Sequence, residues 1–423
     1  MFKRISTIGL GYIGLPTAAV FAKHGIEVIG VDVKQEAVDT INRGEIHIVE
    51  PGLAGVVKNA VENGLLRATV TPEPADAFLI AVPTPFKKTG AEVPEPDLTY
   101  IESASRAIAP VLKKGDLVVL ESTSPVGATE RMADWLAEER PDLSFPQAKG
   151  EESDIRIAHC PERVLPGHVL EELISNDRVV GGMTSKCSEL AVALYKTFVK
   201  GECVVTNART AEMAKLTENS FRDVNIAFAN ELSIICDKLD IDVWELIALS
   251  NRHPRVNILQ PGPGVGGHCI AVDPWFIVAS APDESKLIRA AREVNDQKPE
   301  WVVNKVKLAV ADYLQANPDK TAKDVTVACY GLAFKPDIDD LRESPALNIT
   351  KSIAEFHKGK LLVIEPNIDA ITSTIGSEKL KLTSLQESFE SADIHVLLVD
   401  HKEFKNQERP KTKYVVDTRG IWG

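Results

Sequence analysis

The chain lacks the features that would place it in a membrane or on a nucleic acid. In its 423 residues no apolar run approaches the roughly 18 consecutive residues of a membrane-spanning helix. Glycines and Tyr12 interrupt the first apolar stretch, MFKRISTIGLGYIG, which is therefore unlike a secretory signal. The formal net charge of -13 disfavours nucleic acid and anionic membrane surfaces as partners, because both attract basic proteins. A local basic pocket for a small phosphorylated molecule is still compatible with this charge.

Cysteine is scarce and scattered. None of the six cysteines belongs to a CxxC pair or lies in a Cys/His cluster, so we expect neither a metal site nor a disulfide framework. A reducing cytoplasm is the expected location. For most of these residues a small buried hydrophobic role is the simplest interpretation. The six are Cys160, Cys187, Cys203, Cys236, Cys269 and Cys329.

The order of the apolar segments predicts two α/β regions with a helical region between them. With 44% hydrophobic and 26% charged residues, a chain of this length suggests two or three globular domains. Strand-like runs at 5–8, 27–31, 77–82 and 117–121 alternate with helical stretches, the first helix at about 12–23, which is typical of a doubly wound parallel sheet. Helical patterns dominate from about 207 to 311. Strand patterns return at 324–331, 360–366, 392–400 and 413–420.

The first strand is followed by a dinucleotide-binding turn. Gly9, Gly11 and Gly14 form GxGxxG, which lets a pyrophosphate approach the amides at a helix N-terminus. Asp32 ends the next strand about 20 residues later, where a carboxylate accepts hydrogen bonds from a ribose 2′-OH and favours NAD over NADP. The segments VPTP (82–85) and ESTSPVG (121–127) follow strands of the same sheet and are expected to line the cofactor cleft. We therefore predict a Rossmann-like first domain.

A polar patch occurs on the central helix, in TAEMAKLTENSFRDVNIAFANEL. At about 100° per residue, Lys215, Asn219 and Arg222 share one face, and Ile226 and Ala229 continue that face as an apolar stripe. Two interpretations stay open. Either the three polar residues lie in a cleft, where a lysine can act as acid or base, or they are the solvated end of an amphipathic helix.

The stretch PGPGVGGHCIAVDPW sets Cys269 behind four glycines. A loop with so few side chains indicates that backbone, or a bound molecule, comes very close to the thiol. The preceding NRHPRVN (251–257) carries Arg252, His253 and Arg255, cations suited to a diphosphate or a sugar, although exposed loop charges are common.

Taken together, these motifs resemble the UDP-glucose/GDP-mannose 6-dehydrogenase family over essentially the whole chain. The matching segments are GLGYIGLP, VPTP, STSPVG, CPERVLPG, AEMAKLTENSFRDVNIAFANEL, GPGVGGHCIAVDP, GLAFKPDIDDLRESP and VVDTRG. The resemblance implies two Rossmann-like doubly wound parallel-sheet domains joined by a central helical region. The expected domains are an NAD-binding domain at 1–200, a helical dimerisation domain at 201–317 and a UDP-sugar-binding domain at 318–423. It also implies a homodimer and an NAD-dependent, four-electron oxidation of a sugar C6 alcohol to a carboxylate.

The resemblance also assigns roles to individual residues. Cys269 is the implied nucleophile and Lys215 the implied base, while either Asp273 or Glu162 handles the hydrolytic water. The implied catalytic set is Cys269, Lys215, Asn219, Asp273, Glu162 and Thr123. The implied cofactor contacts are Gly9, Gly11, Tyr12, Ile13, Gly14, Asp32, Thr84, Thr129 and Arg342. The implied substrate contacts are Arg163, Val164, Lys215, Asn219, Arg222, His253, Arg255, Gly266, Phe334 and Lys335.

One departure from the family pattern bears on the sugar. Many members have Lys before the loop aspartate, whereas Val272 precedes Asp273 here. This favours an acetamido sugar, and we expect UDP-N-acetyl-D-mannosamine, oxidised for a surface polysaccharide, with UDP-N-acetylglucosamine or UDP-glucose as alternatives. Two other hypotheses stay open: a hydroxyacid-type dehydrogenase that releases one NADH per substrate without a covalent step, and a non-catalytic sensor of NAD and a nucleotide sugar.

Overall fold

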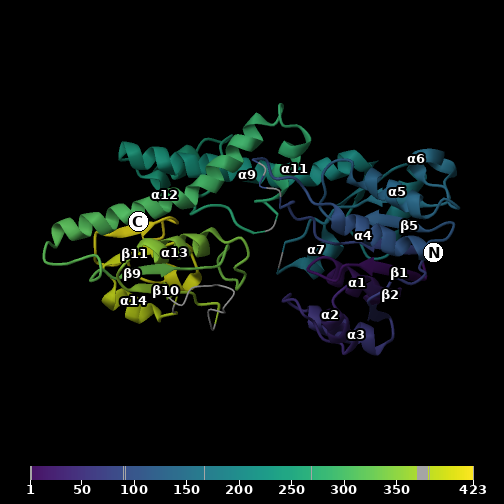
Figure 1. Ribbon diagram of the computed structural model, residues 1–423, viewed down its shortest axis with the longest axis horizontal. Helices are drawn as coiled ribbons and strands as arrows, with labels where there is room; N and C mark the ends of the chain where they lie inside the picture. The colour runs from purple at the N-terminus through teal and green to yellow at the C-terminus, as the bar shows by residue number, and fades with distance from the viewer. Residues whose placement is uncertain are drawn as a thin grey trace. The chain divides into compact units, whose positions relative to one another are not determined.

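The computed structural model describes residues 2–88, 90, 92–165, 167–267, 269–368, 380 and 382–422. It divides the chain into two compact units (Figure 1). The first unit contains residues 1–218 and 275–282, and the second contains residues 219–274 and 283–423. No helix in the described part of the chain combines the length and the apolar character that crossing a membrane requires.

The first unit is built on an eight-stranded sheet with the order β3-β2-β1-β4-β5-β6-β7-β8. Neighbouring strands pair in parallel except β6 and β7, which are antiparallel. The strands are β1 (Arg4–Ile8), β2 (Glu27–Val31), β3 (Leu66–Thr69), β4 (Ala77–Ile80), β5 (Leu117–Leu120), β6 (Arg156–His159), β7 (Arg178–Gly182) and β8 (Cys203–Asn207). This sheet therefore continues past residue 200.

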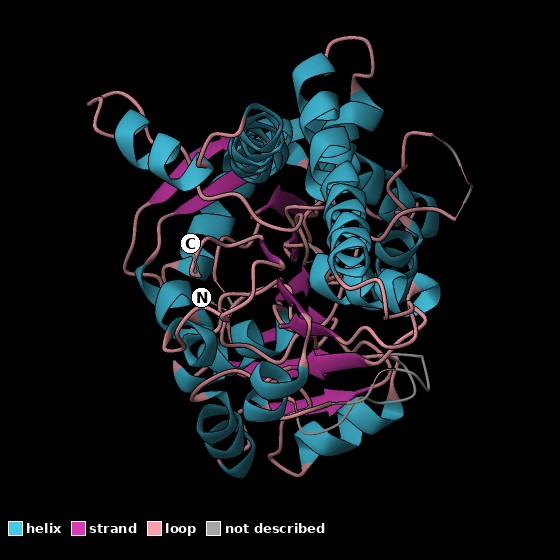
Figure 2. Ribbon diagram, turned by 90° about the vertical axis from the view of Figure 1, so that its left-hand side faces the viewer, coloured by secondary structure: helices cyan, strands magenta, loops and turns pink. Residues whose placement is uncertain are grey.

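Helices cover both faces of this sheet (Figure 2). Apolar side chains of α1, α2, α3, α7 and α8 pack on one face, and those of α4 and α5 pack on the other. Burial on both faces explains why the central strands are almost continuously apolar. The helices are α1 (Gly14–Lys23), α2 (Gln35–Asn42), α3 (Leu53–Glu62), α4 (Thr99–Ile108), α5 (Ala128–Glu139), α6 (Pro146–Lys149), α7 (Val169–Ser175) and α8 (Ser185–Tyr195), with 3-10 turns at Ala109–Val111 and Gly150–Glu152.

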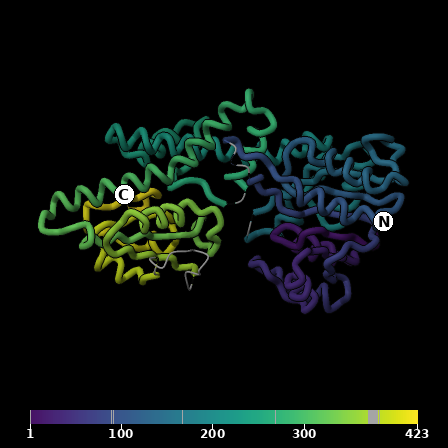
Figure 3. The backbone as a smooth tube through the Cα atoms, viewed as in Figure 1, coloured from purple at the N-terminus to yellow at the C-terminus, as the bar shows by residue number. Residues whose placement is uncertain are grey.

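The second unit contains a four-stranded parallel sheet with the order β10-β9-β11-β12. The chain enters this sheet from the long helix α12, and its colour in Figure 3 runs from green at α12 to yellow at the C-terminus. Its strands are β9 (Val327–Tyr330), β10 (Leu361–Ile364), β11 (Ile394–Leu397) and β12 (Val415–Asp417). The remaining helices are α9 (Ala208–Leu239), α10 (Val243–Ser250), α11 (Asp273–Ser280), α12 (Lys286–Ala316), α13 (Pro345–Phe356), α14 (Leu385–Ser391) and α15 (Lys402–Lys405).

The predicted α/β architecture with two parallel sheets is confirmed. Two details differ from the prediction. The first helix begins at Gly14 instead of about residue 12, because the chain must complete the glycine turn before it becomes helical. The antiparallel pairing of β6 and β7 was not expected from strands and helices that alternate regularly. The helix α9 is continuous, and the boundary between the two units falls within it, after Glu218.

Candidate active site

The glycine turn in the first unit is shaped by contacts within the chain. A Cβ atom added to Gly14 would lie 1.8 Å from the carbonyl oxygen of Gly9, and one added to Gly9 would lie 2.7 Å from the carbonyl oxygen of Ala81. Gly9 also has a left-handed φ of 91°. At Gly11, by contrast, an added Cβ would meet nothing within 4 Å. Gly9 and Gly14 are therefore needed for the turn itself, and Gly11 leaves the surface above it open.

The turn and its carboxylate suit a dinucleotide. One oxygen of Asp32 accepts a hydrogen bond from the amide of Leu10 at 3.0 Å, so the carboxylate lies beside the glycine turn. Gly11 and Tyr12 are exposed and Ile13 is half-buried, just before α1 begins. The N-terminus of a helix carries amides and a positive dipole end that favour a pyrophosphate. These residues thus fit NAD: the turn would hold the pyrophosphate and Asp32 the ribose.

The two threonines predicted to contact the cofactor differ in their hydrogen bonding. The hydroxyl oxygen of Thr84 is buried and has no hydrogen-bond partner among the described residues, as expected of a group that awaits a ligand. Thr129 is 0% exposed, and its amide and hydroxyl both donate to Glu212 of α9, at 2.8 and 2.6 Å. Direct cofactor contact by Thr129 is therefore a wrong prediction, since its polar groups are already used to join α5 to α9.

Thr123, predicted to be catalytic, lies half-buried between two serines that fix its segment. The hydroxyl of Ser122 donates to the carbonyl of Val82 at 2.7 Å, and that of Ser124 donates to the carbonyl of Ser122 at 2.6 Å. The ESTSPVG and VPTP segments are therefore joined directly, as the expectation of a shared cleft edge requires.

Glu162 is buried and held by two donors. Its carboxylate accepts a hydrogen bond from Arg178 at 3.0 Å and one from the amide of Arg163 at 2.6 Å. The guanidinium of Arg178 also lies over the ring of Tyr195, 4.7 Å from its centroid. The hydroxyl of Tyr195 in turn donates to Glu121 at 2.6 Å. Sequence patterns gave no signal for Arg178, and they gave none for the contact between Glu121 and Tyr195, because these partners come from separate elements.

The two residues after Glu162 were predicted to contact the substrate. Arg163 forms an ion pair with Glu218 of α9, 2.6 Å from nitrogen to oxygen, and is only partly exposed. Val164 is half-buried and packs against the first apolar core. In this structure the CPER segment is thus fastened to α9 through Arg163.

The three site residues predicted on helix α9 differ in their exposure to solvent. Asn219 is buried, Lys215 is half-buried and Arg222 is exposed. The three residues therefore do not form one buried polar face, and Arg222 fits the alternative interpretation of a solvated position. The side chain of Asn219 donates to the carboxylate of Asp273 at 2.5 Å, which connects α9 to the first residue of α11.

The thiol of Cys269 is exposed, on a turn closed by hydrogen bonds. The carbonyl oxygen of Cys269 accepts from the amides of Val272 and Asp273 at 3.0 and 2.9 Å. Asp273 follows at once, so the thiol and the pair of Asn219 and Asp273 belong to one local structure. All of these residues lie in the second unit.

Two glycines of this loop allow close packing within the second unit. A Cβ atom on Gly266 would lie 2.6 Å from the carbonyl oxygen of Glu343 and 2.8 Å from the Cβ of Phe334. On Gly264 it would lie 3.0 Å from Pro345. At these two positions the 334–345 segment of the same unit comes close to the loop, which agrees with the alternative that neighbouring backbone approaches it. This packing brings the predicted residue Phe334 against the cysteine loop.

Four predicted residues are exposed in loops of the second unit: His253, Arg255, Lys335 and Arg342. His253 accepts a hydrogen bond from the amide of Arg255 at 3.3 Å. Arg342 forms a bidentate pair with Asp340, at 2.7 Å for the closer contact.

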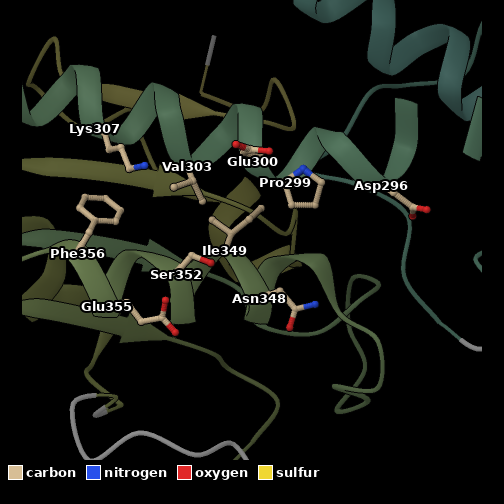
Figure 4. Close-up of a pocket in the computed structure, with 10 residues that line it drawn as sticks. All are labelled: Asp296, Pro299, Glu300, Val303, Lys307, Asn348, Ile349, Ser352, Glu355 and Phe356. Atoms are coloured by element: carbon tan, nitrogen blue, oxygen red, sulfur yellow. The ribbon is translucent and has the colours of Figure 1, made fainter. Parts of the chain in front are cut away.

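A groove of about 540 Å³ lies between α12 and α13 in the second unit (Figure 4). Acidic, apolar and polar side chains mix along it, and it contains none of the predicted site residues. Ten residues line it: Asp296, Pro299, Glu300, Val303, Lys307, Asn348, Ile349, Ser352, Glu355 and Phe356.

Comparison with known proteins shows a family over most of the chain. Three domain models of the UDP-glucose/GDP-mannose dehydrogenase family match the chain: the NAD binding domain matches residues 3–199, the central domain residues 209–297 and the UDP binding domain residues 328–423. The chain is 66% identical to the UDP-N-acetyl-D-mannosamine dehydrogenase of Escherichia coli (strain K12), over 100% of this chain and 99% of that protein. It is 62% identical to the NDP-N-acetyl-D-galactosaminuronic acid dehydrogenase of Ralstonia nicotianae, over 100% and 96%. A solved structure, the UDP-D-ManNAc dehydrogenase of Pyrococcus horikoshii, aligns with a TM-score of 0.85 and 38% identity over 99% of this chain and 96% of that chain.

Proposed function

Because the chain belongs to the UDP-glucose/GDP-mannose dehydrogenase family, we propose that it oxidises the C6 alcohol of UDP-N-acetyl-D-mannosamine to the carboxylate, with NAD as its cofactor. The observation that carries the proposal is the exposed thiol of Cys269 on a turn joined to Asn219 and Asp273. A thiol so placed suits a reaction with a covalent stage, which a one-step hydroxyacid dehydrogenase does not need. Val272 and the full-length similarity to UDP-N-acetyl-D-mannosamine dehydrogenase support the acetamido sugar.

The proposed mechanism assigns a step to each residue. NAD, held by the glycine turn and Asp32, would supply the hydride acceptor for both oxidation steps. Lys215 takes the hydroxyl proton as the alcohol becomes an aldehyde. The thiolate of Cys269 then adds to the aldehyde, because an aldehyde cannot donate hydride until a nucleophile has added to it. Oxidation of the adduct leaves a thioester, and water, positioned by Asp273 or Glu162, hydrolyses it to the carboxylate. Donors such as Asn219 stabilise the oxyanion by about 3 kcal/mol each.

The sugar and the stoichiometry are tested together. Purified enzyme is given UDP-N-acetylmannosamine, UDP-N-acetylglucosamine, UDP-N-acetylgalactosamine and UDP-glucose, and NADH and uronate are counted. The galacto sugar is included because of the Ralstonia relative. We expect two NADH per molecule of the manno sugar. The variant Cys269→Ser should fall by at least about 1,000-fold in uronate formation, as expected for loss of a nucleophile. Turnover of another sugar but not of the manno sugar would refute the proposed substrate. A yield of one NADH per sugar would refute the four-electron reaction. Tight binding without NADH formation would indicate a sensor.

We also propose that the three parts of the chain keep the roles expected for 1–200, 201–317 and 318–423, and that two copies pair through α9. The positions of the family-model matches support the first proposal. The second rests on large apolar side chains that α9 leaves exposed at intervals of seven residues: Phe221, Phe228 and Ile235 are 68%, 52% and 45% exposed. Such spacing is typical of a helix that packs along another helix. The scattered cysteines favour a cytoplasmic location.

A further inference from the structure

Helix α9 carries a buried polar stripe that the sequence pattern did not reveal. Asp223 and Asn230 lie four and eleven residues after Asn219, which places all three within about 40° on one face. Asn219 is 8% exposed, and Asp223 and Asn230 are each 0% exposed. Burying polar side chains costs free energy unless they are hydrogen-bonded, so a stripe of this kind calls for a partner at every position.

Asn219 and Asn230, at the two ends of this stripe, bind the two ends of the loop 262–273 that carries Cys269. The side-chain oxygen of Asn230 accepts a hydrogen bond from the amide of Gly262 at 2.9 Å. The side-chain nitrogen of Asn219 donates to Asp273 at 2.5 Å. Eleven helical residues rise about 16 Å, so α9 sets a fixed span for the loop 262–273, and Cys269 lies inside that span.

A chain of hydrogen bonds sets the orientation of Asn230. Its side-chain nitrogen donates to Asn295 of α12 at 2.8 Å, which leaves its oxygen for Gly262. Asn295 donates in turn to the carboxylate of Asp223 at 2.8 Å. Asp223 also accepts from Arg292, at 2.5 Å, and both side chains are 0% exposed. The hydrogen bonds thus run from Arg292 through Asp223, Asn295 and Asn230 to the amide of Gly262, and each side chain orients the next.

We propose that Asn230 is a positioning residue for Cys269: with Asn295 and the Arg292–Asp223 ion pair behind it, it fixes the Gly262 end of the loop and so the place of the thiol. Four glycines in 262–267 make this loop costly to order, and a hydrogen bond at its start removes much of that freedom. The proposal rests on the proposed function in one respect, namely that the thiol is needed for the second oxidation and not for the first.

Loss of the hydrogen bond between Asn230 and Gly262 should therefore affect the two oxidation steps differently. The first hydride leaves the alcohol without help from the thiol, so aldehyde formation should continue. Addition of the thiolate to the aldehyde needs the loop in place, and a displacement of about 1 Å can slow such a step on the order of 100-fold. A general loss of structure would slow both oxidations together, whereas loss of positioning should separate them.

The test uses the full-length enzyme and four variants. In Asn230→Ala we expect NADH per UDP-N-acetylmannosamine to fall from two towards one, with aldehyde trapped by hydrazine, and amide hydrogen exchange in peptides covering 262–273 to be at least about 10-fold faster. Asn230→Asp keeps an oxygen for the Gly262 amide and should recover much of the protection. Asn295→Ala, which frees the amide of Asn230, should show the same signature in a weaker form and replaces Asn230→Ala if that variant does not fold.

The matched control is Asn225→Ala. Asn225 lies on the same helix, but its side chain donates to the carbonyl of Phe221 in the preceding turn and so holds no loop. It should leave the NADH ratio and the loop exchange unchanged. A folded Asn230→Ala with wild-type loop exchange, or with two NADH per sugar, overturns the proposal. If the wild-type enzyme itself makes no NADH, the proposed function fails, and the exchange data alone then decide whether Asn230 anchors the loop.

Discussion

Glu121 is the residue whose chemistry departs most from its usual state in solution. It lies directly after β5, completely buried, and burial raises the pKa of its carboxyl to about 7, against the opposing effects of Arg178 and the hydroxyl of Tyr195. One of its oxygens accepts from Tyr195, and the other has no partner among the described residues, which suits a protonated acid. Arg178, which acts on the pKa of Glu121, also donates a hydrogen bond to Glu162. The titrating Glu121 is therefore linked through Arg178 to a candidate catalytic residue.

This arrangement predicts a pH-dependent effect of Glu121→Gln on stability. In the unfolded chain the carboxyl loses its proton near pH 4.5, but in the folded protein only near pH 7. Stability therefore falls as pH rises between these values, because the folded state holds the proton longer. Glutamine keeps the oxygen for Tyr195 without the charge, so the advantage of the variant should be small at pH 5 and grow to about 3 kcal/mol at pH 8.

Urea unfolding of both proteins from pH 5 to pH 8 measures this difference. The buried His159, whose pKa is lowered to about 3 by burial, contributes the opposite slope below pH 6.5, but it is common to both proteins and cancels. Glu62→Gln, at an exposed position on α3, is the control for replacing a carboxylate by an amide. Parallel stability curves for Glu121→Gln and the wild type would show that Glu121 does not titrate in this range.

At the scale of the element, α9 stabilises the start of α5 with a carboxylate. The first residues of α5 have no side-chain cap of their own, since its N-cap is Gly127 in the left-handed region. Glu212 takes that place: one oxygen accepts from the amide of Gly127 at 2.6 Å, and the other accepts from the amide and hydroxyl of Thr129. A negative charge also interacts favourably with the positive end of the helix dipole.

Glu212→Leu should therefore destabilise the protein by about 2 to 4 kcal/mol, because it leaves the two buried donors of Thr129 and the half-buried amide of Gly127 without an acceptor. The control is Glu130→Leu on the same helix α5, whose exposed ion pair with Arg209 is worth at most about 1 kcal/mol. Urea unfolding followed by circular dichroism gives both values. Equal midpoints for the two variants would contradict a capping role for Glu212.

The same elements show which features can be predicted from sequence. Regular alternation of strands and helices predicted both parallel sheets, and GxGxxG with Asp32 predicted the dinucleotide turn, because these depend on short-range patterns. The buried contacts of Asn230, Arg178 and Glu212 join residues far apart in the chain, and no spacing rule encodes them. The role given to Thr129 failed for the same reason: nothing near it in sequence signals Glu212 as its partner.

At the scale of the whole molecule, the exposed apolar stripe of α9 predicts a dimer. Three large side chains at intervals of seven residues, Phe221, Phe228 and Ile235, would remain in water in a single chain. Burying them against a second copy removes that cost, at about 25 cal/mol per Å² of apolar surface. Two copies that pair through the same patch form a closed assembly with twofold symmetry.

The variant Phe228→Glu should break this assembly, because it places a charge in the middle of the stripe on both copies. Sedimentation should then show the 46.1 kDa mass of one chain for the variant and twice that mass for the wild type. Tyr100→Glu on α4, where the aromatic side chain is 48% exposed in the first unit, is the matched control and should leave the mass doubled. A single-chain mass for the wild type, or a doubled mass for Phe228→Glu, would show that the stripe does not join two copies.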